Sequence, residues 1–147
     1  MNPNATQLVL LADDDEDDQL MLESLFRQIC PDYLFATVPD GQALIERLEW
    51  SNEPPPSLIL LDLNMPLVGG FDVLRHLKAS ERLYTIPVIV LTTSSEERDV
   101  RQSYALGANA FLTKPGSHAD LKAMVEVLRD FWLRQARLPA GGTLTSH

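Results

Sequence analysis

The 147-residue chain is 45% hydrophobic and 22% charged, which is typical of one globular domain and excludes a disordered, collagenous or disulfide-scaffold protein. It carries 21 acidic and 12 basic residues, a net charge of −9. We expect no nucleic-acid or anionic-membrane partner, because both bind basic surfaces. The lone Cys30 cannot form an internal disulfide, no apolar run is long enough to span a membrane, and the polar residues 1–7 do not form a signal peptide. These features together predict a cytoplasmic protein.

Five short apolar runs recur at intervals of about 25 residues, with room for a helix between each pair. Several runs are continuous rather than alternating, which is typical of strands buried on both faces of a parallel sheet between helices. We therefore predict an α/β protein with a doubly wound (βα)5 parallel sheet. Its five strands are residues 8–11, 34–38, 58–61, 88–91 and 110–112.

The segments between these runs carry helical periodicity. A longer apolar stripe over residues 121–132 predicts the last helix. We assign residues 7–135 to one domain and residues 1–6 and 136–147 to flexible tails. The first helix has apolar residues at positions i, i+3, i+4 and i+7: Leu22, Leu25, Phe26 and Ile29.

Six acidic residues in a row, from Asp13 to Asp18, follow the first predicted strand. The later ones are explained by a helix start, because Asp15 can cap the helix and its successors complement the helix dipole. That explanation does not cover Asp13 and Asp14, which precede the cap. In doubly wound sheets, ligands bind at the carboxyl ends of the strands, where the strand order reverses. Asp13 and Asp14 are therefore candidate binding residues.

Asp62 follows the third predicted strand, at the same edge of the sheet as Asp13 and Asp14. Three carboxylates in one cleft would raise one another's pKa values, and a hard divalent cation with oxygen ligands would relieve their repulsion. Mg²⁺ binds in proteins through one or two carboxylates, water and phosphate oxygens, and a backbone carbonyl near Asn64 could add a ligand. The sequence therefore predicts a Mg²⁺ site at this edge.

The fourth and fifth predicted strands end in hydroxyl and ammonium groups. Thr92 offers a donor to a phosphate oxygen, and Ser94 or Ser95 can cap the next helix. Lys114 follows the fifth strand, where its ammonium can reach the acid cluster and pair with Asp62 or with a phosphoryl oxygen, although a lysine in such a position is usually a surface residue. The bond between Lys114 and Pro115 can be cis, which would aim the lysine.

Five motifs occur together in a characteristic order. They are the acid pair 13–14, the run 60–66, the glycines 69–70, the strand 87–92 and the segment 107–115. With these motifs the chain resembles a response regulator receiver domain, of the CheY-like type, over nearly its whole length. The resemblance implies a flavodoxin-like sheet with strand order 2-1-3-4-5. It also implies two-component signalling, in which a histidine kinase donates a phosphoryl group.

The resemblance implies a role for each matching residue. The aromatic residue that switches position on phosphorylation would be Phe111, where many relatives carry Tyr. Because Phe lacks the tyrosine hydroxyl, this switch would be steric. Asp62 would be the phosphoacceptor. The Mg²⁺ ligands would be Asp62, Asp14, Asn64 through its backbone carbonyl and Asp13 through water, while Thr92 and Lys114 would hold the phosphoryl group and Phe111 would be the aromatic switch.

The end of the chain carries Phe-Trp-Leu-Arg at 131–134 and Leu-Pro at 138–139. This ending is similar to that of single-domain regulators that partner phytochrome-type histidine kinases. The similarity implies such a kinase as partner, no output domain and no enzymatic turnover of a separate substrate. The last helix also suits a homodimer face, although its apolar stripe is equally explained by the core.

Three other functions fit parts of this pattern. An aspartyl-phosphate phosphatase would need a second Asp as general acid two residues after the nucleophile, where this chain has Asn64. A nucleotide-binding protein would need a glycine-rich phosphate loop, which the sequence lacks. A pseudo-receiver, meaning an interaction module that is not phosphorylated, usually lacks an acid, the acceptor or the lysine. All of these are present, so a pseudo-receiver is kept only as the alternative.

Overall fold

The computed structural model describes residues 7–139 and contains one five-stranded sheet. All neighbouring strands pair in parallel, in the order β2-β1-β3-β4-β5. This confirms the predicted doubly wound fold and its strand order. The strands are β1 (Leu8–Ala12), β2 (Leu34–Val38), β3 (Leu58–Leu61), β4 (Val88–Thr92) and β5 (Ala110–Thr113).

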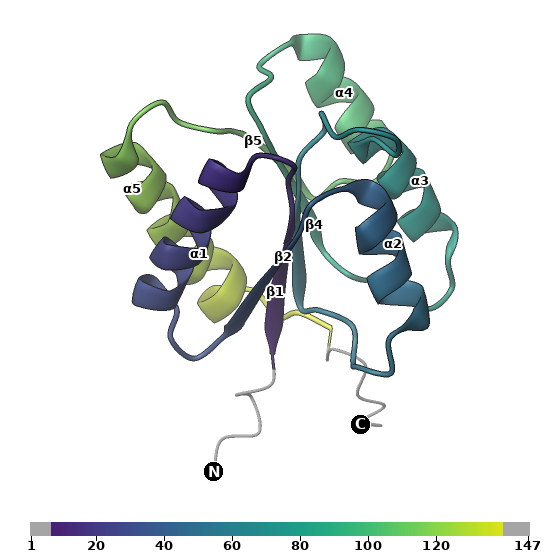
Figure 1. The fold of residues 1–147 in the computed structure, drawn as a ribbon, viewed down its shortest axis with the longest axis horizontal. Helices are drawn as coiled ribbons and strands as arrows, with labels where there is room; N and C mark the ends of the chain where they lie inside the picture. Colours follow the sequence, from purple (N-terminus) through teal and green to yellow (C-terminus); the bar gives the residue numbers. More distant parts are fainter. Residues whose placement is uncertain (1–6, 140–147) are drawn as a thin grey trace.

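Helices cover both faces of the sheet: α1 and α5 lie on one face, and α2, α3 and α4 lie on the other (Figure 1). Within residues 7–139, no helix combines the length and the apolar character needed to cross a bilayer. The helices are α1 (Glu16–Ile29), α2 (Gly41–Trp50), α3 (Gly70–Ala79), α4 (Glu97–Ala105) and α5 (His118–Leu128), and the π-helical segment η2 (Arg129–Gln135) continues α5.

The core consists of two layers, one on each face of the sheet. Along β1, Val9 and Leu11 pack toward α1 and α5, while Leu10 and Ala12 pack toward α2 and α3. All four side chains are fully buried. Because side chains alternate along a strand, a strand covered on both faces has apolar residues at every position. This explains the continuous apolar runs in the sequence.

The start of α1 follows the prediction. Asp15 is the N-cap, and its carboxylate accepts a hydrogen bond from the backbone N of Asp18 at 3.1 Å. The cap fixes where α1 begins, directly after the acids at the end of β1. The four predicted core residues of the helix are buried: Leu22, Leu25, Phe26 and Ile29.

The start of α4 differs from the prediction. Its N-cap is Glu96, which makes no side-chain cap hydrogen bond, rather than Ser94 or Ser95. The loop after β4 continues through residue 95 before the helix begins. From that loop the Ser94 hydroxyl donates to Asp99 Oδ2 at 2.6 Å and accepts from the backbone N of Glu96 at 3.3 Å. Ser94 therefore supports the first turn of α4 from outside the helix.

The last helix changes its hydrogen-bond pattern after Leu128. In the π-helical segment η2, backbone hydrogen bonds span five residues rather than four. The core-facing position therefore passes from Leu128 to Leu133, and both are buried. Phe131, which belongs to the predicted apolar stripe, is 54% exposed.

The predicted tails are only partly within the described range. Residues 1–6 and 140–147 lie outside it. Of the predicted C-terminal tail, residues 136–139 are described, and Leu138 packs against the core layer of α1 and α5. Packed structure therefore extends beyond the predicted domain end at residue 135.

Candidate functional site

Four strands deliver polar side chains to one edge of the sheet, where their carboxyl ends meet. Asp13 and Asp14 follow β1, Asp62 follows β3, Thr92 ends β4 and Lys114 follows β5. In the sheet, β2 pairs with one edge of β1 and β3 pairs with the other edge, so the chain changes direction across the sheet after β2. The site therefore lies where the strand order reverses, which is where doubly wound sheets bind ligands.

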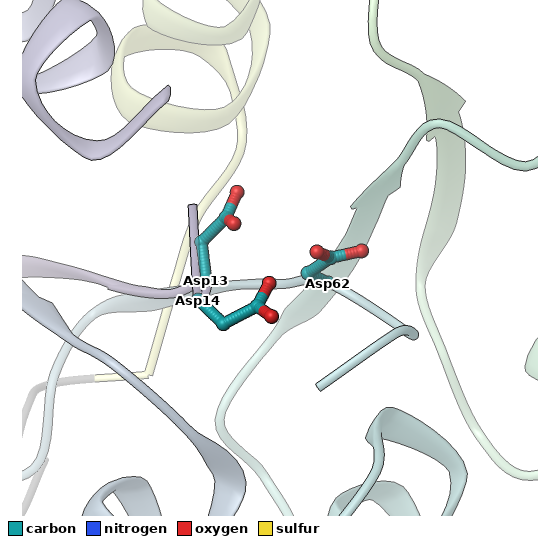
Figure 2. A group of neighbouring side chains, drawn as sticks. All are labelled: Asp13, Asp14 and Asp62. Carbon is teal, nitrogen blue, oxygen red and sulfur yellow. The ribbon is translucent and has the colours of Figure 1, made fainter. Parts of the chain in front are cut away.

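Three carboxylates converge at this edge. Figure 2 shows Asp13 and Asp14 leaving the end of β1 beside Asp62. Oxygen atoms of the three residues, one from each, all lie within 4.8 Å of one another. Asp13 and Asp62 are 0% and 5% exposed, whereas Asp14 is an exposed residue. The cluster thus joins two buried acids to one that solvent reaches.

Backbone N–H groups fix one oxygen of each buried carboxylate. Asp13 Oδ1 accepts from the backbone N of Asp15 at 2.9 Å, and Asp62 Oδ1 accepts from the backbone N of Asn64 at 3.3 Å. The backbone of Asp62 also lies close to α3, because a Cβ at Gly70 would sit 2.7 Å from the Asp62 carbonyl oxygen. Glycine is needed there for this close approach.

Lys114 reaches the acid cluster, as predicted, but its hydrogen bonds do not go to Asp62. Nζ donates to Asp13 Oδ2 at 2.6 Å and to Asp18 Oδ2 at 2.8 Å, whereas Asp62 Oδ2 is 3.8 Å away. The lysine side chain is 9% exposed. Sequence reasoning missed Asp18, because the helix dipole already explained an acid at that position. The available signal was its place in the first turn of α1, beside the strand end that carries Asp13.

Burial and ion pairing shift the pKa values of Asp13 and Lys114 in opposite directions. Burial raises the pKa of Asp13, and the hydrogen bond from Lys114 offsets this only in part. Burial alone would lower the pKa of Lys114, but its hydrogen bonds to Asp13 and Asp18 outweigh that effect and raise the pKa. Lys114 therefore stays protonated at physiological pH. Its single positive charge is shared among three carboxylates, those of Asp13, Asp18 and Asp62, and Asp14 adds a further acid beside them.

The excess of carboxylates over the one ammonium at this edge of the sheet suits a divalent cation. The three converging carboxylates offer only oxygen atoms, and those oxygens lie close enough together to share one ion. Hard cations such as Mg²⁺ and Mn²⁺ prefer oxygen ligands of this kind. The donor set of Asp13, Asp14 and Asp62 therefore fits a hard divalent cation.

Thr92 and Phe111 lie on the strands beside the acids. Thr92 is buried, and its Oγ1 accepts from the backbone N of Ser94 at 3.5 Å. Phe111 is partly buried and packs against the core layer of α2 and α3. Its backbone N donates to the hydroxyl of Tyr104, on α4, at 3.2 Å. Sequence reasoning did not single out Tyr104, whose hydroxyl links α4 to β5.

The expectation of a cis bond between Lys114 and Pro115 is contradicted. No cis peptide bond occurs within residues 7–139, so this bond is trans. The trans form of an X–Pro bond is intrinsically favoured by about 0.5–1 kcal/mol. With the trans bond, the Lys114 ammonium already reaches Asp13 and Asp18.

The fold and the acid cluster define a class of protein. The sequence profile of the response regulator receiver domain matches residues 9–126, and the chain belongs to this family. Receiver domains act in two-component signalling as signalling proteins rather than as classical enzymes. The predicted family is therefore confirmed.

Individual relatives place the chain more narrowly within the family. It is 39% identical to response regulator Rcp1 of Synechocystis sp., over 93% of this chain and 96% of that protein. The crystal structure of the Mn²⁺-bound form of Rcp1 matches with a TM-score of 0.84 over 91% of this chain and 99% of that one. The phosphorylated cyanobacterial phytochrome response regulator RcpA matches with a TM-score of 0.86 and 34% identity, over 92% and 99% of the two chains. The predicted similarity to phytochrome-associated regulators is confirmed.

Proposed function

We propose that Asp62 accepts a phosphoryl group from a sensor histidine kinase, and that this modification switches a partner-binding surface. The environment of Asp62 carries the proposal. Its carboxylate is 5% exposed, lies beside two further acids that suit a cation, and has the Lys114 ammonium 3.8 Å away. A divalent cation and an ammonium next to a carboxylate nucleophile can together offset the charge on transferred phosphoryl oxygens.

The transfer is a displacement at phosphorus. An Asp62 oxygen forms a bond to the phosphorus of a phosphohistidine while the phosphorus–nitrogen bond breaks, and the ring, protonated on its other nitrogen, leaves with that electron pair as neutral imidazole. Lys114 places its ammonium against one phosphoryl oxygen. The Thr92 hydroxyl accepts from the backbone N of Ser94, so its own hydrogen can be donated to another phosphoryl oxygen. The product is an aspartyl phosphate.

We expect Asp14 and Asp62 to bind Mg²⁺ directly, together with the backbone carbonyl of Asn64. Mg²⁺, when bound, offsets the charge on the transferred oxygens. Both oxygens of Asp13 already accept hydrogen bonds, which supports a role for Asp13 through a bridging water. The Mn²⁺-bound form of the relative Rcp1 supports a divalent cation at this site.

The donor we propose is a phytochrome-type histidine kinase. This rests on the similarity to RcpA, a cyanobacterial phytochrome response regulator, over 92% of the chain. A cytoplasmic location is consistent with the acidic composition and with Cys30, a buried free thiol. We expect no nucleic-acid or membrane partner.

Thr92 and Phe111 form the proposed switch. Movement of Thr92 onto the phosphoryl group would leave space into which the partly buried Phe111 ring can move. Because the backbone of Phe111 is bonded to Tyr104, a shift of β5 would also displace α4. The switch therefore works by packing and by one hydrogen bond, from the backbone N of Phe111 to the Tyr104 hydroxyl.

A second copy of the chain is the proposed partner at the end of α5. Val127 and Phe131 are both exposed there, and Phe131 packs edge-on against Trp132 with ring centroids 5.3 Å apart. Exposed apolar side chains in one place favour association. Light scattering with and without a phosphoryl mimic tests this homodimer, and a monomer under both conditions contradicts it.

The test of the main proposal is phosphorylation by a small donor. With Mg²⁺ and acetyl phosphate, intact mass should show one phosphoryl group, and peptide mapping should place it on Asp62. Asp62→Asn should abolish the modification, whereas Asp72→Asn, at an exposed aspartate of α3, should leave it unchanged. Modification that persists in Asp62→Asn overturns the proposal. Mg²⁺ binding without any modification would favour the pseudo-receiver, for which the complete set of acids and lysine gives no support.

A further inference from the structure

Lys114 is bound by two acids, and only one of them belongs to the proposed transfer site. Asp13 is part of the carboxylate cluster, but Asp18 lies on α1 and is separate from it. The Asp18 carboxylate does not cap α1, because Asp15 does so, and it is not one of the three converging carboxylates. Its contact with Lys114 therefore needs its own explanation.

The three N–H donors of the ammonium are unequally placed. Asp13 and Asp18 accept two of them at 2.6 and 2.8 Å, while Asp62 Oδ2, at 3.8 Å, is beyond hydrogen-bond distance. The lysine is thus drawn toward α1 and away from the proposed phosphoacceptor. To contact a phosphoryl group on Asp62, the ammonium has to move toward β3 and loosen one of its two bonds.

Asp18 is the partner that can release the lysine. Asp13 is 0% exposed, so separation from Lys114 would leave a buried charge unpaired, whereas the Asp18 side chain is 32% exposed. Asp18 and Lys114 also line a surface cavity of about 160 Å³ between α1 and the loop before α5. The Asp18 carboxylate can turn into that space and be hydrated when the lysine leaves.

We propose that Asp18 is a positioning residue that holds Lys114 away from Asp62 and competes with the phosphoryl group for the lysine. The inference rests on the proposed function of Asp62. In the unphosphorylated protein, Asp18 keeps the nucleophile clear of the ammonium. In the phosphorylated protein, it lowers the affinity of the lysine for the phosphoryl group and thereby limits the population of the switched state.

The test compares Asp18→Asn with Asp17→Asn. Asp17 lies in the same turn of α1, so Asp17→Asn removes the same charge from the same place. Asp17 is not one of the three described carboxylates that pair with Lys114. The probe is beryllofluoride, a mimic of the phosphoryl group, titrated with Mg²⁺ present and followed by ¹⁹F NMR. Asp18→Asn should tighten beryllofluoride binding roughly three- to tenfold, and Asp17→Asn should leave it within about twofold of the parent protein.

Two further measurements separate positioning from a general charge effect. In a Lys114→Ala background, Asp18→Asn should have no effect on beryllofluoride affinity, because the competition acts through the lysine. A crystal structure of metal-free Asp18→Asn should show Nζ within hydrogen-bond distance of Asp62. Equal effects of Asp18→Asn and Asp17→Asn, weaker binding in Asp18→Asn, or an effect that persists without Lys114 overturns the proposal.

Failure of the proposed function gives a different result. A parent protein that binds no beryllofluoride and is not phosphorylated with Mg²⁺ present contradicts the role of Asp62. The Asp18→Asn structure still decides the positioning of the lysine in that case. A lysine that stays in place, with Nζ 3.8 Å from Asp62, overturns the role of Asp18.

Discussion

Ion pairs occur in two settings in this protein. At the site, Lys114 is 9% exposed and pairs with the fully buried Asp13, whereas on α3 the side chains of Arg75 and Asp72 are 53% and 64% exposed and pair at 3.0 Å. An exposed pair contributes about 0–1 kcal/mol. Removal of one partner from a buried pair leaves a charge without compensation and is much more destabilising. The comparison indicates that Lys114 stabilises the fold in addition to its proposed role in phosphoryl binding.

The largest expected effect is that of Lys114→Met. Methionine has an uncharged side chain of similar length, so the substitution fills the same space but leaves Asp13, Asp18 and Asp62 without the ammonium. We expect a loss of about 2–4 kcal/mol in the free energy of unfolding at neutral pH, measured by urea denaturation. A loss below about 1 kcal/mol would show that the buried setting adds nothing to this pair.

Mg²⁺ should stabilise the folded protein, because it binds acids that are brought together only by folding. At ten times its Kd, a ligand specific to the folded state adds about 1.4 kcal/mol. The gain should be greater in Lys114→Met, where the acids lack their cation, and absent in Asp14→Asn. Thermal unfolding with and without Mg²⁺ measures this, and an equal gain in Asp14→Asn would place the ion elsewhere.

Asp13→Asn should make the protein more stable at neutral pH, because it removes a buried carboxylate while Lys114 keeps Asp18 as a partner and is not left unpaired. The folded protein raises the pKa of this carboxyl above its ordinary value of 3.8, mainly through burial, so its ionisation opposes folding. The gain should be present at pH 7, shrink as the pH falls through the raised pKa, and vanish below 3.8. Urea denaturation at several pH values tests the sign, and destabilisation at pH 7 would mean that the bond to Lys114 outweighs burial.

Arg75→Ala should produce the smallest effect. Its bond to Asp72 joins two side chains that water reaches, so the free energy of unfolding should change by less than about 0.5 kcal/mol. The same urea denaturation as for Lys114→Met makes the two values directly comparable. A change as large as that for the lysine would remove the distinction between the two settings.

Much of the fold could be predicted because its physical causes are local. A strand buried on both faces has to be apolar at every position, so the runs at 8–11 and 58–61 identify β1 and β3 almost to the residue. The approach of Asp13, Asp14 and Asp62 follows from topology, since parallel strands end at the same edge. Their roles in phosphorylation remain predictions.

The features that sequence did not reveal depend on three-dimensional detail. The choice of Asp18 over Asp62 by Lys114 depends on where a long, flexible side chain points. The exposure of Phe131 depends on a change of helix type that leaves no mark on apolar periodicity. The need for Gly70 arises from the backbone of Asp62, eight positions earlier. None of these has a signature in residue spacing.

The pairing of Asp13 with Lys114 also has a consequence for synthesis on the ribosome. The two residues are 101 positions apart, and the lysine follows β5, the last strand of the sheet. A nascent chain that has made β1 to β4 already carries the acids but not their cation. Completion of the charged site therefore waits for the last strand of the sheet, and an unfinished chain lacks the ammonium that the finished protein holds beside Asp62.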